Sequence, residues 1–474
     1  MLYKLDKGYD ETNPSSIENY AKGLIGKTFY DVLKDKVEVN NEIADDNEFA
    51  YYYENKKRKG GLGDFIEECY FNYKCNNESK PDFEKAGVEL KVTPYKINRN
   101  KSISAKERLI ITMIDYIKVV NEKFEESHMW AKGKLILLIY YLYKQEITNR
   151  LRYSIDYVKL FTPPEQDLAI IKHDFEVIVN KIRAGKAHEL SESDTLYLGA
   201  APKAASSKDR RAQPFNEELA MPRAFAYKNS YMTYVLNNYI VPGVTTYESI
   251  IKEHTELSFE DYVVNKLNGY NNYSVDELCD VFNLNYKRKP KNLESMLVYR
   301  ILGIRGNQAE EFIKANVVIK TIRIKSNNKI KESMSFPTFK FKEIIKEDWE
   351  NSTFGNYLSE TRFLLVVFKY DENQVLRLKG CQFWNIPYKD LKEVQSVWEK
   401  TKNIIMNGIE IKVVNGRNFN NLPKSSDNRV CHVRPHAQDS NDTYDLPDGN
   451  KFPKQCFWLN KSYVLEQLDK KFLV

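Results

Sequence analysis

A weak internal repeat constrains this chain more than any other feature. Four segments of the first half recur in the second half in the same order. The matched pairs are KLILLIYY (from Lys134) with RFLLVVFK (from Arg362), FEVIVNKIRAG (from Phe175) with WEKTKNIIMNG (from Trp398), AAPKA (from Ala200) with VRPHA (from Val433), and FAYKNSYMTYVL (from Phe225) with FWLNKSYVLEQL (from Phe457). The repeat predicts two copies of one fold, and 474 residues suffice for two domains. We place them at 1–243 and 258–474, joined by a linker at 244–257.

Hydrophobic patterning in the first half predicts a mixture of helices and strands. Alternating or continuous apolar runs rich in β-branched and aromatic residues predict strands at 87–95, which we expect Pro94 to stop, and at 107–116 and 134–143. Apolar residues at helical spacing predict helices at 15–35, entered through serine caps, at 60–73, and at 167–185, ended by Gly185. This order predicts an α/β domain, with a mixed sheet flanked by helices.

Composition narrows the functional classes. The net charge of +6, from 72 Lys and Arg against 66 Asp and Glu, permits a nucleic-acid partner without demanding one. The six cysteines form no CxxC pair, so neither a zinc site nor a disulfide framework is indicated. No apolar run is long enough to cross a bilayer. We expect a cytoplasmic protein with no membrane partner and no nucleotide cofactor.

The segment KPDFEKAGVELKVTP (Lys80 to Pro94) places charged residues around a predicted strand. Glu89 and Lys91 are two residues apart, so both side chains project from one face, while Leu90 faces the core. Asp82 lies in the turn before the strand, and Glu84 and Lys85 in that turn fit solvated surface. Two carboxylates and an ammonium therefore meet at the rim of a sheet. The triplet alone fits a solvated charge run and a metal-dependent nuclease about equally well.

Phosphodiester hydrolysis needs this set of groups. Carboxylate oxygens hold Mg²⁺, which keeps waters and binds substrate phosphate at its open positions. The ion polarises a phosphoryl oxygen and lowers the pKa of a bound water. A lysine beside the metal can orient or deprotonate that water and offset charge on the phosphate.

The sequence around the triplet resembles the MutH family of the PD-(D/E)xK nuclease superfamily, in the stretch SKPDFEKAGVELKVTP (Ser79 to Pro94). As in that family, a glutamate, Glu68, stands fourteen positions before Asp82. A further lysine, Lys132, stands in KGKLILLI, where the family has one on the strand after the motif. The resemblance covers roughly residues 15–240 and implies two tandem domains of the restriction-endonuclease fold.

The resemblance also implies residue roles. Asp82 and Glu89 would bind Mg²⁺ with assistance from Glu68, Lys91 would activate water, and Lys132 would support the site. The family's base-reading loop carries Arg-Pro-Lys, whereas this chain has Ala201-Pro202-Lys203, so only the lysine carries over. The further candidates for base or phosphate contact, each also explained by a solvated cation, are Arg210, Arg211, Arg223 and Lys228.

The second copy departs from the catalytic pattern. Val318 stands at the place of Glu89, Leu297 at that of Glu68 and Glu360 at that of Lys132. Lys320 keeps the place of Lys91, and Glu311 could replace Asp82. We therefore expect a half that does not cut. Its segment HVRPH keeps a recognition arginine, Arg434, followed by His436, so this half either binds DNA and regulates the first or is only structural.

By this resemblance the chain is a type II restriction endonuclease that cuts double-stranded DNA before the guanine of GATC and leaves 5′ overhangs. A mismatch-repair enzyme that nicks one strand is the alternative, and a DNA-binding regulator with an idle site is the third. With one predicted site per chain, a homodimer or a dimer formed on DNA would serve a palindromic target. Methylation sensitivity, the oligomeric state on DNA and the identity of the base-reading residues stay open.

Overall fold

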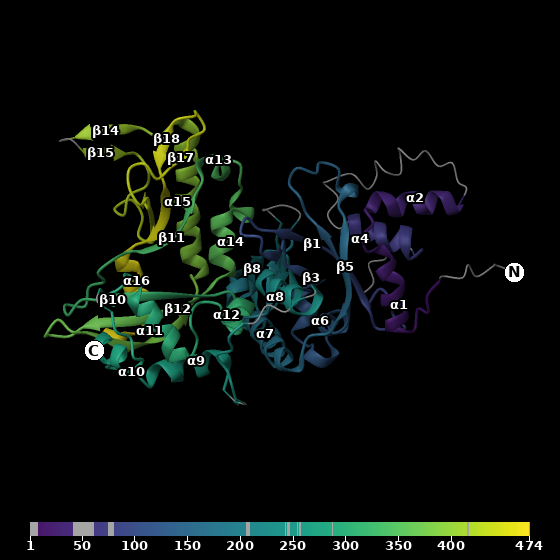
Figure 1. The fold of residues 1–474 in the computed structure, drawn as a ribbon, viewed down its shortest axis with the longest axis horizontal. Coiled ribbons are helices and arrows are strands. Elements are labelled where there is room, and N and C mark those ends of the chain that lie inside the picture. Colours follow the sequence, from purple (N-terminus) through teal and green to yellow (C-terminus); the bar gives the residue numbers. More distant parts are fainter. Residues whose placement is uncertain are drawn as a thin grey trace. The chain divides into compact units, whose positions relative to one another are not determined.

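The chain divides into two units, Met1–Thr246 and Tyr247–Val474, each described by itself (Figure 1). This computed structural model describes residues 8–40, 61–73, 80–204, 209–241, 243, 247–253, 255, 257–286, 288–414 and 417–473. Both units mix strands and helices, so the predicted α/β class is confirmed.

The main sheet of the first unit has the strand order β2-β1-β4-β5. Strand β1 (Glu89–Ile97) runs parallel to β4 (Ile136–Leu142) and antiparallel to β2 (Ile103–Ala105). Strand β5 (Ile155–Phe161) is antiparallel to β4. Five consecutive residues of β4, Ile136 to Tyr140, are buried, as expected for a central strand covered on both faces.

Proline 94 does not stop strand β1, so that expectation was wrong. The Tyr143 N–H donates to Tyr95 O on the β4 side, whereas the Lys106 N–H donates to Pro94 O on the other side. The N–H that Pro94 lacks would therefore point away from β4. Pairing between β1 and β4 continues through Pro94 because the missing N–H faces the opposite side of β1, where pairing with β2 begins only at Tyr95.

Helices of the first 70 residues pack against this sheet. They are α1 (Pro14–Ala21), α2 (Phe29–Asn40) and α4 (Gly61–Phe65), which continues into the π-helical turn Ile66–Tyr70. Asn13, and not a serine, caps α1, because its side chain accepts from the N–H groups of Ser15 and Ser16. The apolar side chains of these helices share one core with Leu90, Leu137 and Ile139 of the sheet.

A second sheet in the first unit has the order β3-β9-β6. Its strands are β3 (Leu109–Met113), β9 (Arg223–Tyr227) and β6 (Leu198–Pro202), and a hairpin of β7 (Arg211–Gln213) and β8 (Asn216–Ala220) precedes β9. The helices of this region are α5 (Tyr116–Val119), α6 (His128–Gly133), α7 (Glu165–Arg183) and α8 (Asn229–Val235). Gly185 follows α7 with φ +69°, a conformation that ends helices.

The second unit repeats this topology. Strand β10 (Val317–Ile324) runs parallel to β12 (Arg362–Tyr370), which pairs antiparallel with β13 (Leu376–Trp384). The second sheet has the order β11-β19-β16, from Met334–Phe339, Gln455–Leu459 and Cys431–Pro435. Helices α13 (Phe341–Ile344), α14 (Thr353–Glu360), α15 (Tyr388–Asn407) and α16 (Lys461–Gln467) follow in the order of α5, α6, α7 and α8.

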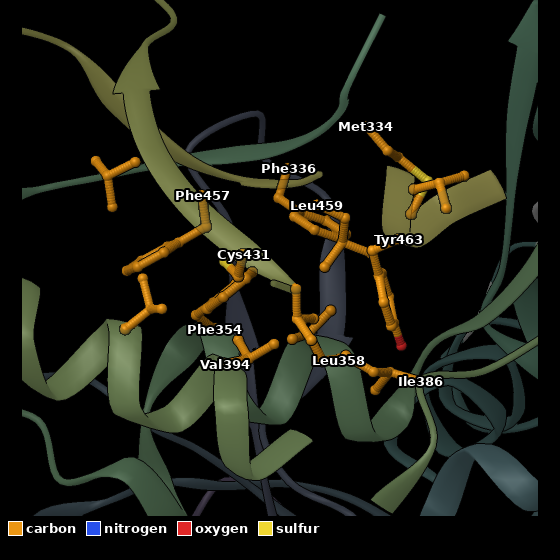
Figure 2. Close-up of a cluster of buried hydrophobic side chains, with 14 of the residues drawn as sticks. Met334, Phe336, Phe354, Leu358, Ile386, Val394, Cys431, Phe457, Leu459 and Tyr463 are labelled. Carbon is orange, nitrogen blue, oxygen red and sulfur yellow. The ribbon is translucent and has the colours of Figure 1, made fainter. Parts of the chain in front are cut away.

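Further elements complete the second unit. They are the helices α9 (Phe259–Asn268), α10 (Val275–Val281), α11 (Leu293–Leu302) and α12 (Glu310–Ala315), and the hairpins β14 (Ile411–Val414) with β15 (Arg417–Asn420) and β17 (Thr443–Asp445) with β18 (Lys451–Pro453). The core joins side chains of the second sheet, of β10 and β12, and of helices α14 and α15, and Figure 2 shows part of it. Phe354 of α14 stacks on Phe457 of β19, with ring centroids 4.3 Å apart.

Individual contacts repeat together with the topology. The Tyr231 hydroxyl donates to Asp167 at 3.1 Å in the first unit, and the Tyr463 hydroxyl donates to Asp390 at 3.0 Å in the second. Both carboxylates are 2% exposed. In each unit a buried tyrosine therefore connects the last helix, α8 or α16, to the long helix, α7 or α15.

Two further observations concern the whole described chain. Its five described cysteines are buried, and none of them forms a disulfide with another described cysteine. None of the described helices combines the length and apolar character that crossing a bilayer requires.

Candidate active site

A tight turn brings Asp82 to the start of strand β1. Phe83 and Val88 exchange backbone hydrogen bonds of 2.9 and 3.2 Å, and Gly87 between them has φ +66°. Because the buried side chains of Phe83 and Val88 anchor both ends of the turn, Asp82 lies beside the strand. Its Oδ2 accepts the Leu90 N–H at 2.8 Å.

The carboxylate of Glu89 is the centre of the site. It is 2% exposed, and its Oε1 accepts from the Lys91 ammonium at 2.6 Å. Lys132 donates to the same oxygen at 3.4 Å and lies 3.3 Å from Oε2. Leu90 points into the core, as expected from strand alternation. In the turn, Glu84 and Lys85 are exposed and pair with Lys80 and Glu11.

Lys132 reaches the site from a helix and not from a strand, which corrects the expectation. It lies in the last turn of α6, which Ser127 caps by accepting the Trp130 N–H. The Tyr227 hydroxyl of β9 donates to Gly133 O at 3.0 Å and fixes the end of the helix. The strand itself begins only at Ile136, which pairs with Glu89.

These groups open onto a hollow of about 610 Å³, here called the Glu89 hollow. Its walls include Asp82, Glu89, Lys91 and Lys132 together with Ile111 to Asp115. Burial raises the pKa of Asp82 above its ordinary value, the nearby Glu89 charge raises it further, and Lys91 and Lys132 oppose the shift. The charges of Glu89, Lys91 and Lys132 therefore all act on the Asp82 carboxyl.

The donor set fits a divalent cation. Oε2 of Glu89 is buried and accepts no hydrogen bond, in spite of its ion-pair distance to Lys132. A cation beside Asp82 and Glu89 would satisfy that oxygen and offset the repulsion between the two carboxylates. The described residues contain no cluster of three or more His, Cys, Asp or Glu side chains placed to hold a metal. Mg²⁺ commonly uses one or two carboxylates and takes its remaining ligands from water and phosphate.

Glu68 lies in the π-helical turn Ile66–Tyr70, and its neighbour Glu67 is the glutamate in the wall of the hollow. A π-helical turn holds more residues than an α-helical turn, so it changes which side chain faces a given direction. The sequence carries no sign of this turn. Both glutamates are half-buried and have partners.

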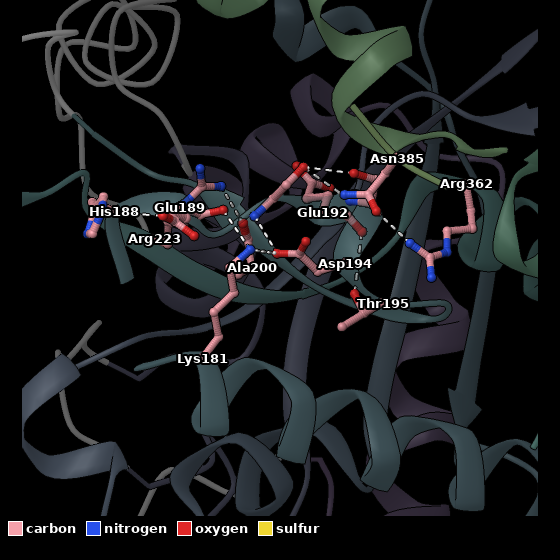
Figure 3. A network of polar contacts seen from close by, with 12 residues as sticks. Lys181, His188, Glu189, Glu192, Asp194, Thr195, Ala200, Arg223, Arg362 and Asn385 are labelled. Carbon is pink, nitrogen blue, oxygen red and sulfur yellow. Dashed lines mark hydrogen bonds and ion pairs between the residues drawn. The ribbon is translucent and has the colours of Figure 1, made fainter. Parts of the chain in front are cut away.

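The candidate DNA contacts divide into two groups, and Figure 3 shows Arg223 of the second group beside Ala200. Lys203, Arg210 and Arg211 are exposed. Arg223 is 9% exposed and donates to Ala200 O at 2.6 Å, and Lys228 is 2% exposed and donates to Thr195 O. This corrects the expectation for the last two: both cations hold the backbone beside β6 and β9 together and are covered by protein.

The second unit has different side chains at the matching positions. Asn316 has φ 52° two residues before Val318, as Gly87 has φ +66° two residues before Glu89, which agrees with Val318 at the place of Glu89. Glu311 accepts from the N–H groups of Ile250 and Ile251 and from the Ser249 hydroxyl, so its carboxylate holds a loop. Lys320 donates to Ser335 O at 2.7 Å, and burial lowers its pKa.

The strand register also corrects one detail of the repeat. Val318 pairs with Phe363, as Glu89 pairs with Ile136, and Glu360 stands three residues before Phe363, whereas Lys132 stands four residues before Ile136. Residues 128–135 lie between the capping Ser127 and β4, and residues 353–361 lie between the capping Ser352 and β12, so the second segment is one residue longer. Sequence comparison alone could not place that insertion.

Arg434 and His436 lie on an exposed part of the second unit. The Arg434 guanidinium lies 4.6 Å from the ring centroid of Trp458, and the His436 ring lies 5.4 Å from it. Both side chains are exposed, so Arg434 and His436 are accessible to a partner.

Sequence reasoning missed further polar side chains of the Glu89 hollow. Lys118, Glu122 and His128 also lie in its wall. The available signal was the four-residue spacing of His128 and Lys132, which puts both on one helix face. It was hidden because a strand was expected for Lys132.

Known proteins are similar to this chain over the residues that form the site. The family model described as DNA mismatch repair enzyme MutH matches residues 71–174, which include Asp82, Glu89, Lys91 and Lys132. The type II restriction enzyme Sau3AI of Staphylococcus aureus is 37% identical, over 87% of this chain and 93% of the relative. The MutH proteins of Shewanella woodyi and Vibrio vulnificus are 29% and 25% identical, over 35% and 42% of this chain and 70% and 86% of the relatives.

Proposed function

Since the chain belongs to the family of the type II restriction enzyme Sau3AI, we propose that its first unit cuts double-stranded DNA at GATC with Mg²⁺. The chain is a site-specific deoxyribonuclease of this type. By family resemblance it cuts before the guanine and leaves 5′ overhangs.

One observation carries the proposal. The Glu89 carboxylate is 2% exposed, lies between Lys91 and Lys132, and keeps one oxygen without a hydrogen bond beside Asp82. A purely structural ion pair would not need two lysines, a second carboxylate and an opening to solvent. Phosphoryl hydrolysis uses all four.

Asp82 and Glu89 would hold the cation, and Glu68 is the proposed assisting carboxylate. A divalent ion bound there supplies Lewis acidity toward a phosphoryl oxygen and a water of lowered pKa. Lys91 is placed to orient the attacking water, and in its neutral amine form it would take up the proton that the water loses. Lys132 holds the Glu89 carboxylate and adds positive charge where charge develops on the phosphate. Glu67→Gln and Glu68→Gln should be compared, because a loss of cleavage confined to Glu67→Gln would transfer the assisting role.

Recognition of the bases is assigned to the exposed cations after β6. Lys203 stands at the position of the family's recognition lysine, and Ala201 stands where the family has an arginine. Arg210 or Arg211 would take over the role of that arginine. Lysine and arginine read guanine O6 and N7 in the major groove. Arg223 and Lys228 are left out because protein covers them.

The second unit is proposed to bind DNA without cutting it. Val318 replaces the central glutamate, and Glu311 and Lys320 are held by internal hydrogen bonds. Arg434 and His436, exposed beside Trp458, are the proposed DNA contacts. Cutting both strands then requires two chains on one site, as a homodimer or a dimer formed on DNA, or successive nicks. Salt-sensitive binding of segment 258–474 to a duplex tests this assignment.

Digestion of a sequenced plasmid by the purified chain in Mg²⁺, followed by end mapping, tests the function. We expect fragments with GATC overhangs, no cleavage in EDTA, and no cleavage of a plasmid from which GATC has been removed. Open circles alone would instead support a strand-nicking repair enzyme. The mismatch repair relatives match less than half of this chain, which favours restriction over nicking. The complete acid and lysine set weighs against an idle regulator.

A further inference from the structure

His128 shares the Glu89 hollow with the catalytic groups. It is the first residue of α6, and Lys132 follows four positions later on the same helix. Residues at this spacing lie on one face, about 6 Å apart along the axis. The side chain is 54% exposed, so the imidazole borders the hollow and also reaches solvent.

Glu122 fixes one side of the imidazole. Its Oε1 lies 2.6 Å from His128 Nδ1, and its Oε2 accepts the His128 backbone N–H at 3.3 Å. Glu122 is only 18% exposed and lies in the same wall. In the described part of the chain Nε2 has no hydrogen-bond partner, so the second ring nitrogen is available to a ligand.

The second unit has a threonine, Thr353, at the position that corresponds to His128. There Glu347 accepts from the backbone N–H and the hydroxyl of Thr353 at the start of α14. The capping serines correspond as well, since Ser127 caps α6 and Ser352 caps α14. A threonine therefore satisfies the glutamate. The histidine adds a second nitrogen, and it does so in the unit that carries Glu89 and Lys132.

We propose that His128 binds the substrate strand at a phosphate next to the one that is cut. This rests on the proposed function. An imidazolium donates from both nitrogens, so with Nδ1 bound to Glu122 the Nε2–H is left for an anion. Lys132 and His128, one helix turn apart, then meet successive phosphates of one strand. His128 is thus a substrate-binding residue that registers the DNA on the catalytic groups.

The test compares His128→Thr and His128→Gln with the wild-type chain on a GATC duplex. His128→Thr copies the second unit and keeps a hydroxyl for Glu122. Exposed His173 on α7 supplies the control His173→Thr. Binding is measured in Ca²⁺ at several salt concentrations, cleavage in Mg²⁺ at low and saturating DNA, and folding by thermal unfolding.

His128→Thr should weaken binding about tenfold, the scale of one hydrogen bond to a charged group. It should also reduce the slope of log K against log salt by about 0.9, the value for one lost phosphate contact. The rate at saturating DNA should change by less than about threefold, because the missing group binds and does not react. His128→Gln should regain part of the affinity through its amide N–H but not the salt slope.

Wild-type affinity and slope in His128→Thr would overturn the inference, and so would a fall of the saturated rate with unchanged binding. Equal losses in His173→Thr would also overturn it. A wild-type chain that fails to cleave in Mg²⁺ refutes the proposed function instead, so the two failures are distinguished.

Discussion

The ammonium of Lys91 lies 2.6 Å from Oε1 of Glu89, two residues earlier on the same strand, while the other oxygen of that carboxylate accepts no hydrogen bond. Strand alternation puts both side chains on one face. Lys132 of α6 then approaches the same carboxylate from another element. The Glu89 carboxylate is buried and contacts two lysines, yet its Oε2 accepts no hydrogen bond. We therefore expect Asp82 and Glu89 to bind a cation that uses this oxygen, and the first prediction tests this.

Glu89→Gln and Asp82→Asn should each lower cleavage at GATC at least about 100-fold, the scale for loss of one strong electrostatic contact to a transition state. Each substitution removes a charge that would hold the cation but keeps the size of the side chain. Binding of a GATC duplex in a gel-shift assay should stay within about threefold, because the change affects chemistry first. Glu84→Gln, on the exposed side of the same turn, is the control and should cleave normally. Full cleavage by either site variant would refute the assignment.

Lys203→Ala should reduce discrimination between GATC and sites that differ by one base, by about tenfold. A lysine or arginine contact to guanine contributes about 1–3 kcal/mol of discrimination. Cleavage rates on matched oligonucleotides measure the ratio. Exposed Lys159 on β5 provides the control variant Lys159→Ala, which should keep the wild-type preference. An unchanged preference in Lys203→Ala would remove Lys203 from the base-reading residues.

Tyr231→Phe and Tyr463→Phe should each lower the free energy of unfolding by about 1–3 kcal/mol, because each leaves a buried carboxylate with one donor fewer. The two tyrosines make the same contact in separate units, to Asp167 and Asp390. The losses should therefore add in the double variant to within about 0.5 kcal/mol. Denaturant unfolding measures all three variants. A loss for Tyr231→Phe with none for Tyr463→Phe would show that the contact is not equivalent in the two units.

His432 should make the second unit sensitive to acid. Asn460 donates from Nδ2 to the carbonyls of Asn428 and Arg429, so its Oδ1 accepts from His432 Nδ1–H at 2.6 Å. Burial lowers the pKa of His432 below its usual value. The unfolded chain then binds the proton at a higher pH than the folded chain. The stability gained from neutral His432 is present above pH of about 6.5 and is lost as the pH falls through the lowered pKa.

His432→Asn keeps an N–H donor for Asn460 and cannot titrate. Thermal unfolding at pH 7.5 and 5.5 should therefore show a smaller drop in Tm for this variant than for the wild-type chain. Exposed His173→Asn serves as the control and should follow the wild-type chain. An equal drop in His432→Asn would assign the acid sensitivity to other groups.

The sequence by itself determined the α/β class, the repeat and the contact between Glu89 and Lys91, because strand alternation and a short turn are local properties of the chain. The order of the matched segments was enough to predict a second copy, and its strands and helices follow the same order.

Only the tertiary structure decided which distant residues join the site. Lys132 and His128 lie on α6, a helix that sequence patterning did not predict because a strongly apolar run follows it directly. At the other wall, Glu67 rather than Glu68 borders the hollow, and both lie in a π-helical turn. Arg223 and Lys228 carry charge in a promising stretch of sequence, yet packing covers both. Burial and side-chain direction depend on neighbours that are remote along the chain, so no local pattern encodes them.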